Sequence, residues 1–209
     1  MGRGAFAGPL YVGGVIFPPT TNYEQQTRLL SYGINDSKKV KPNTRKLLAK
    51  IIQEKSLAYH VSIIGVAQIN RVGIGNATFN AMRDVVKNLR EKCQLSVVNG
   101  QLSKTERFYV LVDGFYVKYL KGIGLENQKG LIHGDEISLS IAAASIIAKV
   151  ARDQHMRKLS AKYKAYGWGR NKGYGTNFHR IQISKFGPTP LHRTAFLKNH
   201  IRRWLQKLQ

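Results

Sequence analysis

Apolar residues recur along the chain with two spacings, one typical of helices and one typical of strands. Residues 42–55 and 74–92 carry apolar positions three or four apart, which predicts two amphipathic helices. We expect their inward faces to consist of Leu47, Leu48, Ile51 and Ile52 in the first helix and of Phe79, Met82, Val86 and Leu89 in the second. Short apolar runs at 10–17 and 59–66 predict strands, and weaker patterns predict a helix at 23–31 and a strand at 115–120.

The middle of the chain combines a strand signal with a helix signal. Residues 108–112 are apolar without a break, which is typical of a strand buried on both faces of a helix-covered sheet. Residues 140–150 are small or branched and predict a mostly buried helix, followed by a second helix with a stripe at Met156, Leu159, Tyr163 and Tyr166. A last helix should align Leu197, Ile201, Trp204 and Leu208. Strands that alternate with helices predict an α/β fold.

This region contains two acidic residues at the ends of predicted elements. Asp113 ends the apolar run, and Asp135 stands just before the predicted buried helix. Open α/β sheets bind ligands at the carboxyl ends of their strands, and carboxylate oxygens are ligands for divalent metals. The same two residues would serve equally well as a turn residue and as a negative charge at a helix start.

The charge balance identifies the class of partner. With 34 basic and 11 acidic side chains, the formal net charge is +23, which indicates a polyanionic partner and favours nucleic acid over an anionic membrane surface. The single cysteine, Cys93, excludes an internal disulfide and fits a reducing cytoplasm. No apolar run is long enough to span a membrane, and glycine and proline interrupt the apolar amino terminus, which argues against a signal peptide.

Three polar segments contain the residue types that contact nucleic acid. Gly2-Arg3-Gly4 allows a ligand to approach the backbone closely, or is simply a flexible terminus. Residues 35–39 could bind phosphate, or form a solvated basic loop. Residues 170–176 present one tyrosine among cations and glycines, an arrangement that suits a sugar or base contact or a turn with a half-buried ring.

Taken together and in this order, the motifs resemble those of the ribonuclease HII family over nearly the whole chain. The residues that carry the resemblance are Gly2-Arg3-Gly4, Asn35-Asp36-Ser37-Lys38-Lys39, Leu111-Val112-Asp113-Gly114, Gly134-Asp135, residues 142–150, Arg152-Asp153, residues 172–176 and residues 187–193.

The resemblance implies an α/β fold with a ribonuclease H-like mixed sheet flanked by helices and a helical carboxyl-terminal extension. Residues 1–153 would form the catalytic core, and residues 154–209 the extension. The implied activity is endonucleolytic cleavage of the RNA strand in RNA–DNA hybrids, and at single ribonucleotides in DNA, leaving 5′-phosphate and 3′-hydroxyl ends. It implies neither a membrane nor an obligatory protein partner.

The resemblance also implies roles for individual residues. The family holds two Mg²⁺ or Mn²⁺ ions with four carboxylates, and Asp113 and Asp135 match the third and fourth. Gly2, Arg3 and Gly4 match the backbone clamp that senses the ribose 2′-hydroxyl, and Tyr174 matches the tyrosine beside the sugar at the scissile junction. Substrate contacts are further implied for Ser37, Lys38, Ser145 and Lys172.

Two positions depart from the family pattern. An Asp-Glu pair, the first two metal ligands, precedes Gly-Arg-Gly by one residue in the family, and Met1 occupies that intervening position here. The pair would lie upstream of Met1 on a central strand, so we expect the 209-residue chain alone to cleave hybrids poorly and a chain bearing the pair to be active. Asn171 replaces the usual histidine.

Three functional hypotheses remain. The first is a ribonuclease HII, and the second is a catalytically silent protein that binds RNA–DNA hybrids. The third is an unrelated basic structural protein such as a ribosomal component.

Overall fold

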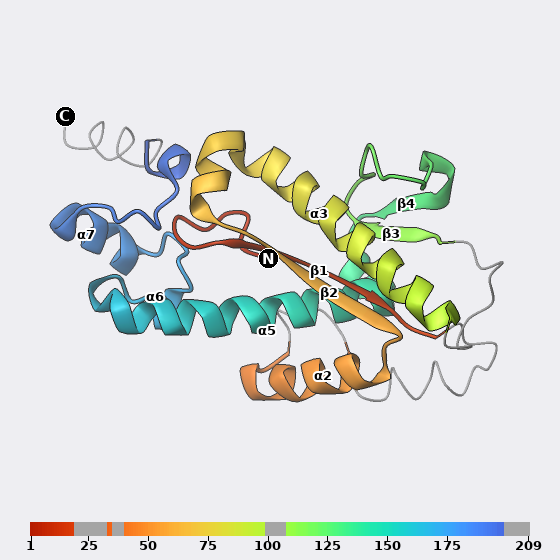
Figure 1. The fold of residues 1–209 in the computed structure, drawn as a ribbon. Helices are drawn as coiled ribbons and strands as arrows, with labels where there is room; N and C mark the ends of the chain where they lie inside the picture. The colour runs from red at the N-terminus through yellow and green to blue at the C-terminus, as the bar shows by residue number, and fades with distance from the viewer. Residues whose placement is uncertain (19–32, 35–39, 99–107, 199–209) are drawn as a thin grey trace. The chain divides into compact units, whose positions relative to one another are not determined.

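A computed structural model describes residues 1–18, 33–34, 40–98 and 108–198 (Figure 1). The longer elements are β1 (Leu10–Ile16), α2 (Pro42–Lys55), β2 (Ala58–Ile64), α3 (Val66–Val98), β3 (Val110–Asp113), β4 (Gln128–Leu131), α4 (Gly134–Ile137), α5 (Leu139–Lys162), α6 (Trp168–Asn171) and α7 (Asn177–Phe186). Short 3-10 turns occupy Leu125–Asn127 and Lys164–Tyr166. The predicted helix at 23–31, the polar turn at 35–39 and the last helix beyond residue 198 lie outside the described residues.

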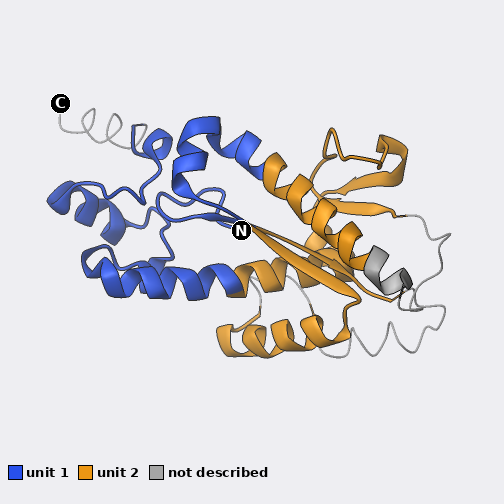
Figure 2. Cartoon of the chain, viewed as in Figure 1, with its two compact units in different colours: residues 1–11, 63–78, 151–209 blue, residues 12–62, 79–150 orange. Residues whose placement is uncertain are grey.

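The chain forms two compact units, which Figure 2 shows in different colours. Unit 1 contains Met1–Tyr11, Ile63–Thr78 and Ala151–Gln209, and unit 2 contains Val12–Ser62 and Phe79–Val150. The predicted boundary between a core at 1–153 and an extension at 154–209 stays a prediction. Within the described ranges, no helix has the length and apolar character needed to cross a bilayer.

In unit 2, β1 lies between helices because its side chains alternate. Val15 packs into a core with Leu48 and Ile146, whereas Val12 and Ile16 pack against a second core with Val85 and Leu89. The glycines between them follow the same alternation. A Cβ at Gly13 would overlap the carbonyl oxygen of Ala144 in α5, and one at Gly14 would overlap Val85 in α3. The two glycines that interrupt the apolar run therefore let a helix approach each face of the strand.

Helix α2 spans the range that its apolar spacing predicts. Pro42 stands at its first turn, where a missing N–H costs nothing, and the chain is extended again at Ser56. Leu48 and Ile52 are buried, and Ile51 packs against the same core. The inward orientation predicted for Leu47 is wrong, because its side chain is 59% exposed. Ala49 is buried in place of Leu47, so the inward face of the helix is rotated slightly from the one that the apolar pattern predicts.

Helix α3 begins eight residues before the predicted start at 74. It contains a break at Gly73, with φ 79° and ψ 157°, so the second segment begins where the apolar spacing predicts. Leu89 is buried as expected, while Phe79, Met82 and Val86 pack as partly buried residues on the core around Val112.

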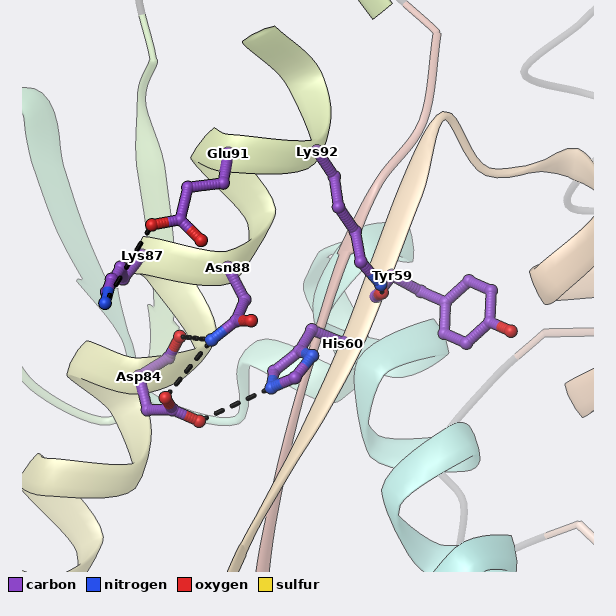
Figure 3. Close-up of polar contacts among 7 residues, drawn as sticks. All are labelled: Tyr59, His60, Asp84, Lys87, Asn88, Glu91 and Lys92. Carbon is purple, nitrogen blue, oxygen red and sulfur yellow. Dashed lines mark hydrogen bonds and ion pairs between the residues drawn. The ribbon is translucent and has the colours of Figure 1, made fainter. Parts of the chain in front are cut away.

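Polar contacts hold the second segment of α3 to strand β2, as Figure 3 shows. The Asp84 carboxylate lies 3.4 Å from His60 Nε2, and Lys92 Nζ donates to the Tyr59 carbonyl at 2.7 Å. At the start of β2, the Leu57 N–H donates to the carbonyl of Ile16, the last residue of β1. Strand β2 therefore starts beside the end of β1 and runs antiparallel to it.

Strands β3 and β4 form a parallel pair, with Val110 opposite Gln128 and Asp113 opposite Leu131. The prediction that residues 108–112 are buried on both faces is wrong. Val112 is buried against α3, but Leu111 on the opposite face is 40% exposed, because the packing residues described for this pair lie on one side. The prediction of a strand at 115–120 is also wrong. Those residues form a bend and a turn, and the strand that pairs with β3 is β4.

Helix α5 is continuous, although the sequence pattern predicted two helices. Residues 139–162 contain neither glycine nor proline, so nothing in the sequence breaks the helix between its apolar first half and its amphipathic second half. Its second half belongs to unit 1, where Met156 joins a core with Trp168 and Ile183.

Candidate active site

Unit 2 contains a candidate site at the end of β3. Asp113 is the last residue of the strand and lies on its exposed side, and the chain then turns at Gly114 with φ +99°. The Asp113 Oδ1 accepts a hydrogen bond from the Gly134 N–H at 3.3 Å. Because Gly134 directly precedes Asp135, the structure brings the two predicted carboxylate residues to neighbouring positions.

Gly134 makes this approach sterically feasible. A Cβ at Gly134 would lie 2.7 Å from the terminal methyl of Ile141 and 3.5 Å from the Asp113 Cα. His133 precedes it in the left-handed region, with φ 54°, and turns the chain into α4. The short helix α4 then carries Asp135 and Glu136 in its first turn.

The donor set suits a divalent cation in type. Mg²⁺ and Mn²⁺ take oxygen ligands, and Mg²⁺ commonly binds through one or two carboxylates together with waters and substrate phosphates. Among the residues that the structure describes, no group of three or more His, Cys, Asp or Glu side chains could hold a metal ion. Asp113 and Asp135 therefore fit part of a metal site.

Unit 1 contains a separate candidate site, the Gly-Arg-Gly turn. Arg193, fully buried, donates from Nη1 to the Gly2 carbonyl at 2.6 Å and the Arg3 carbonyl at 3.0 Å. Its Nε and Nη2 donate to the Gly8 carbonyl at 3.0 and 2.8 Å. Burial, with a smaller contribution from nearby Arg152, lowers the pKa of Arg193 to about 10, so the guanidinium stays charged at neutral pH. A buried cation thus fixes the backbone of residues 2–8.

Gly2 and Gly4 differ in their surroundings. Gly2 is buried with φ +83°, and a Cβ there would overlap the Arg152 guanidinium. Gly4 is exposed, and a Cβ there would meet no described atom within 4 Å. The Arg3 side chain between them is exposed.

Tyr174 lies beside this turn. Ala5 and Tyr174 form an antiparallel bridge, and the Gly173 carbonyl accepts from the N–H groups of Phe6 and Ala7 at 2.8 and 3.0 Å. The Tyr174 ring is 37% exposed, and the Arg152 guanidinium lies 5.3 Å from its centroid. Arg152 itself is 1% exposed and donates to the Pro9 carbonyl at 3.2 Å. The structure therefore places Gly2, Arg3, Gly4 and Tyr174 together.

The loop before Tyr174 is fastened by its own side chains. Asn171 donates to the Tyr166 carbonyl at 2.8 Å and accepts from the Gly173 N–H at 2.8 Å. Lys172 has φ 53°, and its ammonium group donates to the Gly169 carbonyl. In this chain, the asparagine at the family's histidine position therefore shapes the loop.

A buried histidine pair supports the backbone of Tyr174. The Thr189 N–H donates to His192 Nδ1 at 2.9 Å, so the proton of the neutral His192 ring is on Nε2 and points to His179 Nε2 at 3.2 Å. Trp168 Nε1 donates to the same His179 nitrogen at 3.0 Å. His179 Nδ1 therefore carries that ring's proton and donates it to the Tyr174 carbonyl at 2.9 Å.

Burial favours the neutral form of both rings. It lowers the pKa of His179, and burial together with nearby His179 lowers the pKa of His192 to about 4. Sequence reasoning assigned no role to Arg193, His179 or His192. The His192-Arg193 dipeptide within a predicted family motif was the available signal.

The substrate contacts predicted for three further residues stay predictions. Ser145 is half-buried in α5 of unit 2, and its substrate role stays a prediction. Ser37 and Lys38 lie outside the described residues.

Comparison with known proteins gives a consistent result. The family model described as Ribonuclease HII matches residues 1–200. A protein named Ribonuclease HII from Caldicellulosiruptor bescii is 38% identical over 198 residues, covering 95% of this chain and 84% of that protein. Among solved structures, the PCNA:RNase HII complex from Archaeoglobus fulgidus matches with a TM-score of 0.70 at 22% identity, covering 95% and 91% of the two chains. Bst-RNase HIII in complex with Mn²⁺ matches with a TM-score of 0.63 at 19% identity, covering 92% and 62%.

Proposed function

Since this chain belongs to the ribonuclease HII family and has its ribonuclease H-like fold, we propose that Asp113, Asp135 and the Gly-Arg-Gly turn serve a type 2 ribonuclease H. The chain is an endoribonuclease of that type, and a catalytically silent binder is not favoured. The proposed substrates are the RNA strand of RNA–DNA hybrids and single ribonucleotides embedded in DNA. The observation that carries the proposal is the placement of the Gly-Arg-Gly turn beside Tyr174.

In this proposal, Gly4 and Tyr174 recognise the sugar. The Gly4 backbone is exposed and has no side chain, so a ribose hydroxyl can approach its N–H closely. The Tyr174 ring, backed on one side by Arg152, offers an apolar surface to the sugar at the junction. The buried guanidinium of Arg193 fixes the turn before substrate arrives, so little ordering remains to be done on binding.

Asp113 and Asp135 would hold a divalent ion, Mg²⁺ or Mn²⁺. A related structure, Bst-RNase HIII, was solved with Mn²⁺, which supports this assignment by analogy. When bound, two such ions would activate a water and stabilise the leaving oxygen of the RNA strand. The role of this chain's own residues is to orient the carboxylates, which the Gly134 N–H does for Asp113 through its 3.3 Å hydrogen bond.

Cleavage of a labelled DNA duplex with one embedded ribonucleotide tests the proposal. The 209-residue chain is assayed in Mn²⁺ and Mg²⁺, in parallel with a chain that carries the family's Asp-Glu pair before Met1. We expect cleavage at the ribonucleotide by the chain with the pair and its loss in Asp113→Asn and Asp135→Asn. Glu136→Gln is the matched control, because Glu136 follows Asp135 in the same helical turn and is exposed.

The same assay contains the result that would overturn the proposal. Cleavage of an all-DNA duplex at the same rate would show that the ribose is not recognised. Full activity in both aspartate variants would remove Asp113 and Asp135 from the metal site.

A further inference from the structure

One residue of unit 2 combines high exposure with an unusual backbone. Tyr119, in the loop between β3 and β4, has φ 61° and a side chain that is 85% exposed. The left-handed region costs a non-glycine residue of order 1 kcal/mol or more, and such outliers persist only where their surroundings hold them. A large aromatic ring held in water in this conformation gains nothing from core packing.

Two arginines of α3 hold this loop. Arg83 donates from Nε to the Lys118 carbonyl at 3.0 Å, and its guanidinium lies 5.7 Å from the centroid of the Tyr119 ring. Further along the same helix, Arg90 donates to the Lys121 carbonyl. Beneath these contacts, Val117, Leu120 and Ile123 are buried against Phe79, Met82 and Val86. Hydrogen bonds to its backbone and buried side chains therefore fix the loop that carries Tyr119.

The charge around the ring is positive. Lys118 and Lys121 flank Tyr119 and are exposed, and residues 114–124 contain no acidic side chain. Lys87 lies one turn after Arg83 on α3 and is 73% exposed, although Glu91 lies 3.9 Å from its ammonium group. Glu126 is the acidic side chain that follows the loop. An aromatic ring among cations is the arrangement that binds the bases and phosphates of single strands.

We propose that Tyr119 is a stacking platform for an unpaired nucleotide, with Lys118 and Lys121 on the adjoining phosphates. Arg83 covers one side of the ring, and the exposed side takes the base. A nucleic-acid ligand is favoured over a protein because the net charge of +23 already selects polyanions and because the platform itself carries cations without acids. The platform would bind a single-stranded segment independently of the carboxylates that cleave the hybrid.

The test is binding of a labelled single-stranded oligonucleotide of about ten nucleotides, without divalent metal and at fixed low salt. Tyr119→Ala should weaken its affinity by roughly fivefold to a hundredfold, the range for loss of one base–aromatic stack. Tyr119→Phe keeps the ring and should retain most of the affinity. Tyr119→Trp should add a fluorescence signal that is quenched when the oligonucleotide binds, which reports stacking directly.

Phe186→Ala is the matched control. Phe186 in α7 is 54% exposed and also carries a cation, Lys185 Nζ, 5.3 Å from its ring centroid. Its removal should leave single-strand affinity unchanged. Because Tyr119 is exposed, melting temperatures of all variants should match the parent.

The proposal is overturned if Tyr119→Ala binds the single strand as tightly as the parent chain, as it would if this surface bound a protein. It is equally overturned if Phe186→Ala weakens binding as much, or if Tyr119→Ala lowers the affinity for a blunt hybrid by the same factor. Because the assay contains no metal and measures no cleavage, a failure of the proposed nuclease function leaves its outcome unaffected.

Discussion

Lowering the pH should loosen the support of Tyr174 by protonating the His179–His192 pair. In the neutral network each ring has one donor and one acceptor nitrogen, and all four are in use. A second proton on His192 would sit on Nδ1, which already accepts from the Thr189 N–H. The new Nδ1–H and the Thr189 N–H would then be two donors facing each other, and His192 is only 2% exposed.

The sign and size of the effect follow from the two pKa values. The pKa of His192 is about 4 in the folded chain against 6.5 in the unfolded chain. Between these values the unfolded chain binds more protons, so the free energy of unfolding falls as the pH drops from 6.5 towards 4. A shift of this size corresponds to about 3 kcal/mol, a large share of the roughly 5–15 kcal/mol typical of a folded domain.

Two other histidines contribute in the same direction. Burial lowers the pKa of His179, and it lowers the pKa of His155, with Lys158 and Arg152 adding to the effect. The total loss in the free energy of unfolding at low pH should therefore exceed the contribution of His192 alone. A variant of His192 is needed to isolate that contribution.

The assay is denaturant unfolding at about pH 7, 5.5 and 4, values that bracket the titration of His192, for the parent chain and for His192→Asn. The asparagine oxygen can accept from the Thr189 N–H, so the variant should lose some stability at neutral pH but show a shallower fall with pH. His133→Asn is the control, since it removes an exposed histidine at a left-handed position that asparagine tolerates. An equal slope in the parent and His192→Asn would refute the buried neutral pair.

Three further predictions concern binding and the glycine turn. Hybrid affinity should fall steeply with salt in titrations at several salt concentrations, because a charge of +23 implies many phosphate contacts; a flat dependence would contradict this. Tyr174→Ala should weaken recognition of the RNA–DNA junction about tenfold more than general duplex binding, whereas Tyr174→Phe keeps the ring and should retain it. Gly2→Ala should destabilise the chain by about 2 kcal/mol or more in thermal melts, whereas Gly4→Ala should leave the melting temperature unchanged and reduce cleavage at the ribonucleotide.

The sequence predicted the helices and strands that are specified by residues close together in the chain. Helix α2 has the bounds that its spacing gives, because Pro42 starts it and a continuous apolar face sustains it. Strand β1 was predicted despite its glycines. The positions of Asp113 and Asp135 were also inferred from local cues, a strand end and a helix start. A hydrogen bond now connects Asp113 to Gly134, the residue before Asp135.

The features that the sequence did not predict have a common physical cause. They depend on contacts between residues that are distant in the sequence. Leu47 fits the apolar face of α2, yet its side chain stays exposed among the described elements. The strand β4 has a weak apolar pattern and forms because its backbone pairs with β3. The buried Arg193 joins carbonyls 190 and 191 positions away, and no local pattern marks such a residue as a core component.

In the Gly-Arg-Gly turn, the fold requires one glycine, and a ligand explains the other. Gly2 must be glycine because its backbone is left-handed and Arg152 fills the space of a side chain. Gly4 has neither constraint from the described residues, since a Cβ there meets none of their atoms. A glycine that the fold does not require is best explained by a ligand that comes to the backbone. Because Arg193 binds the carbonyls of Gly2 and Arg3, the fold holds the first half of the turn in place. The second half, at Gly4, stays exposed, as the proposed approach of a ribose requires.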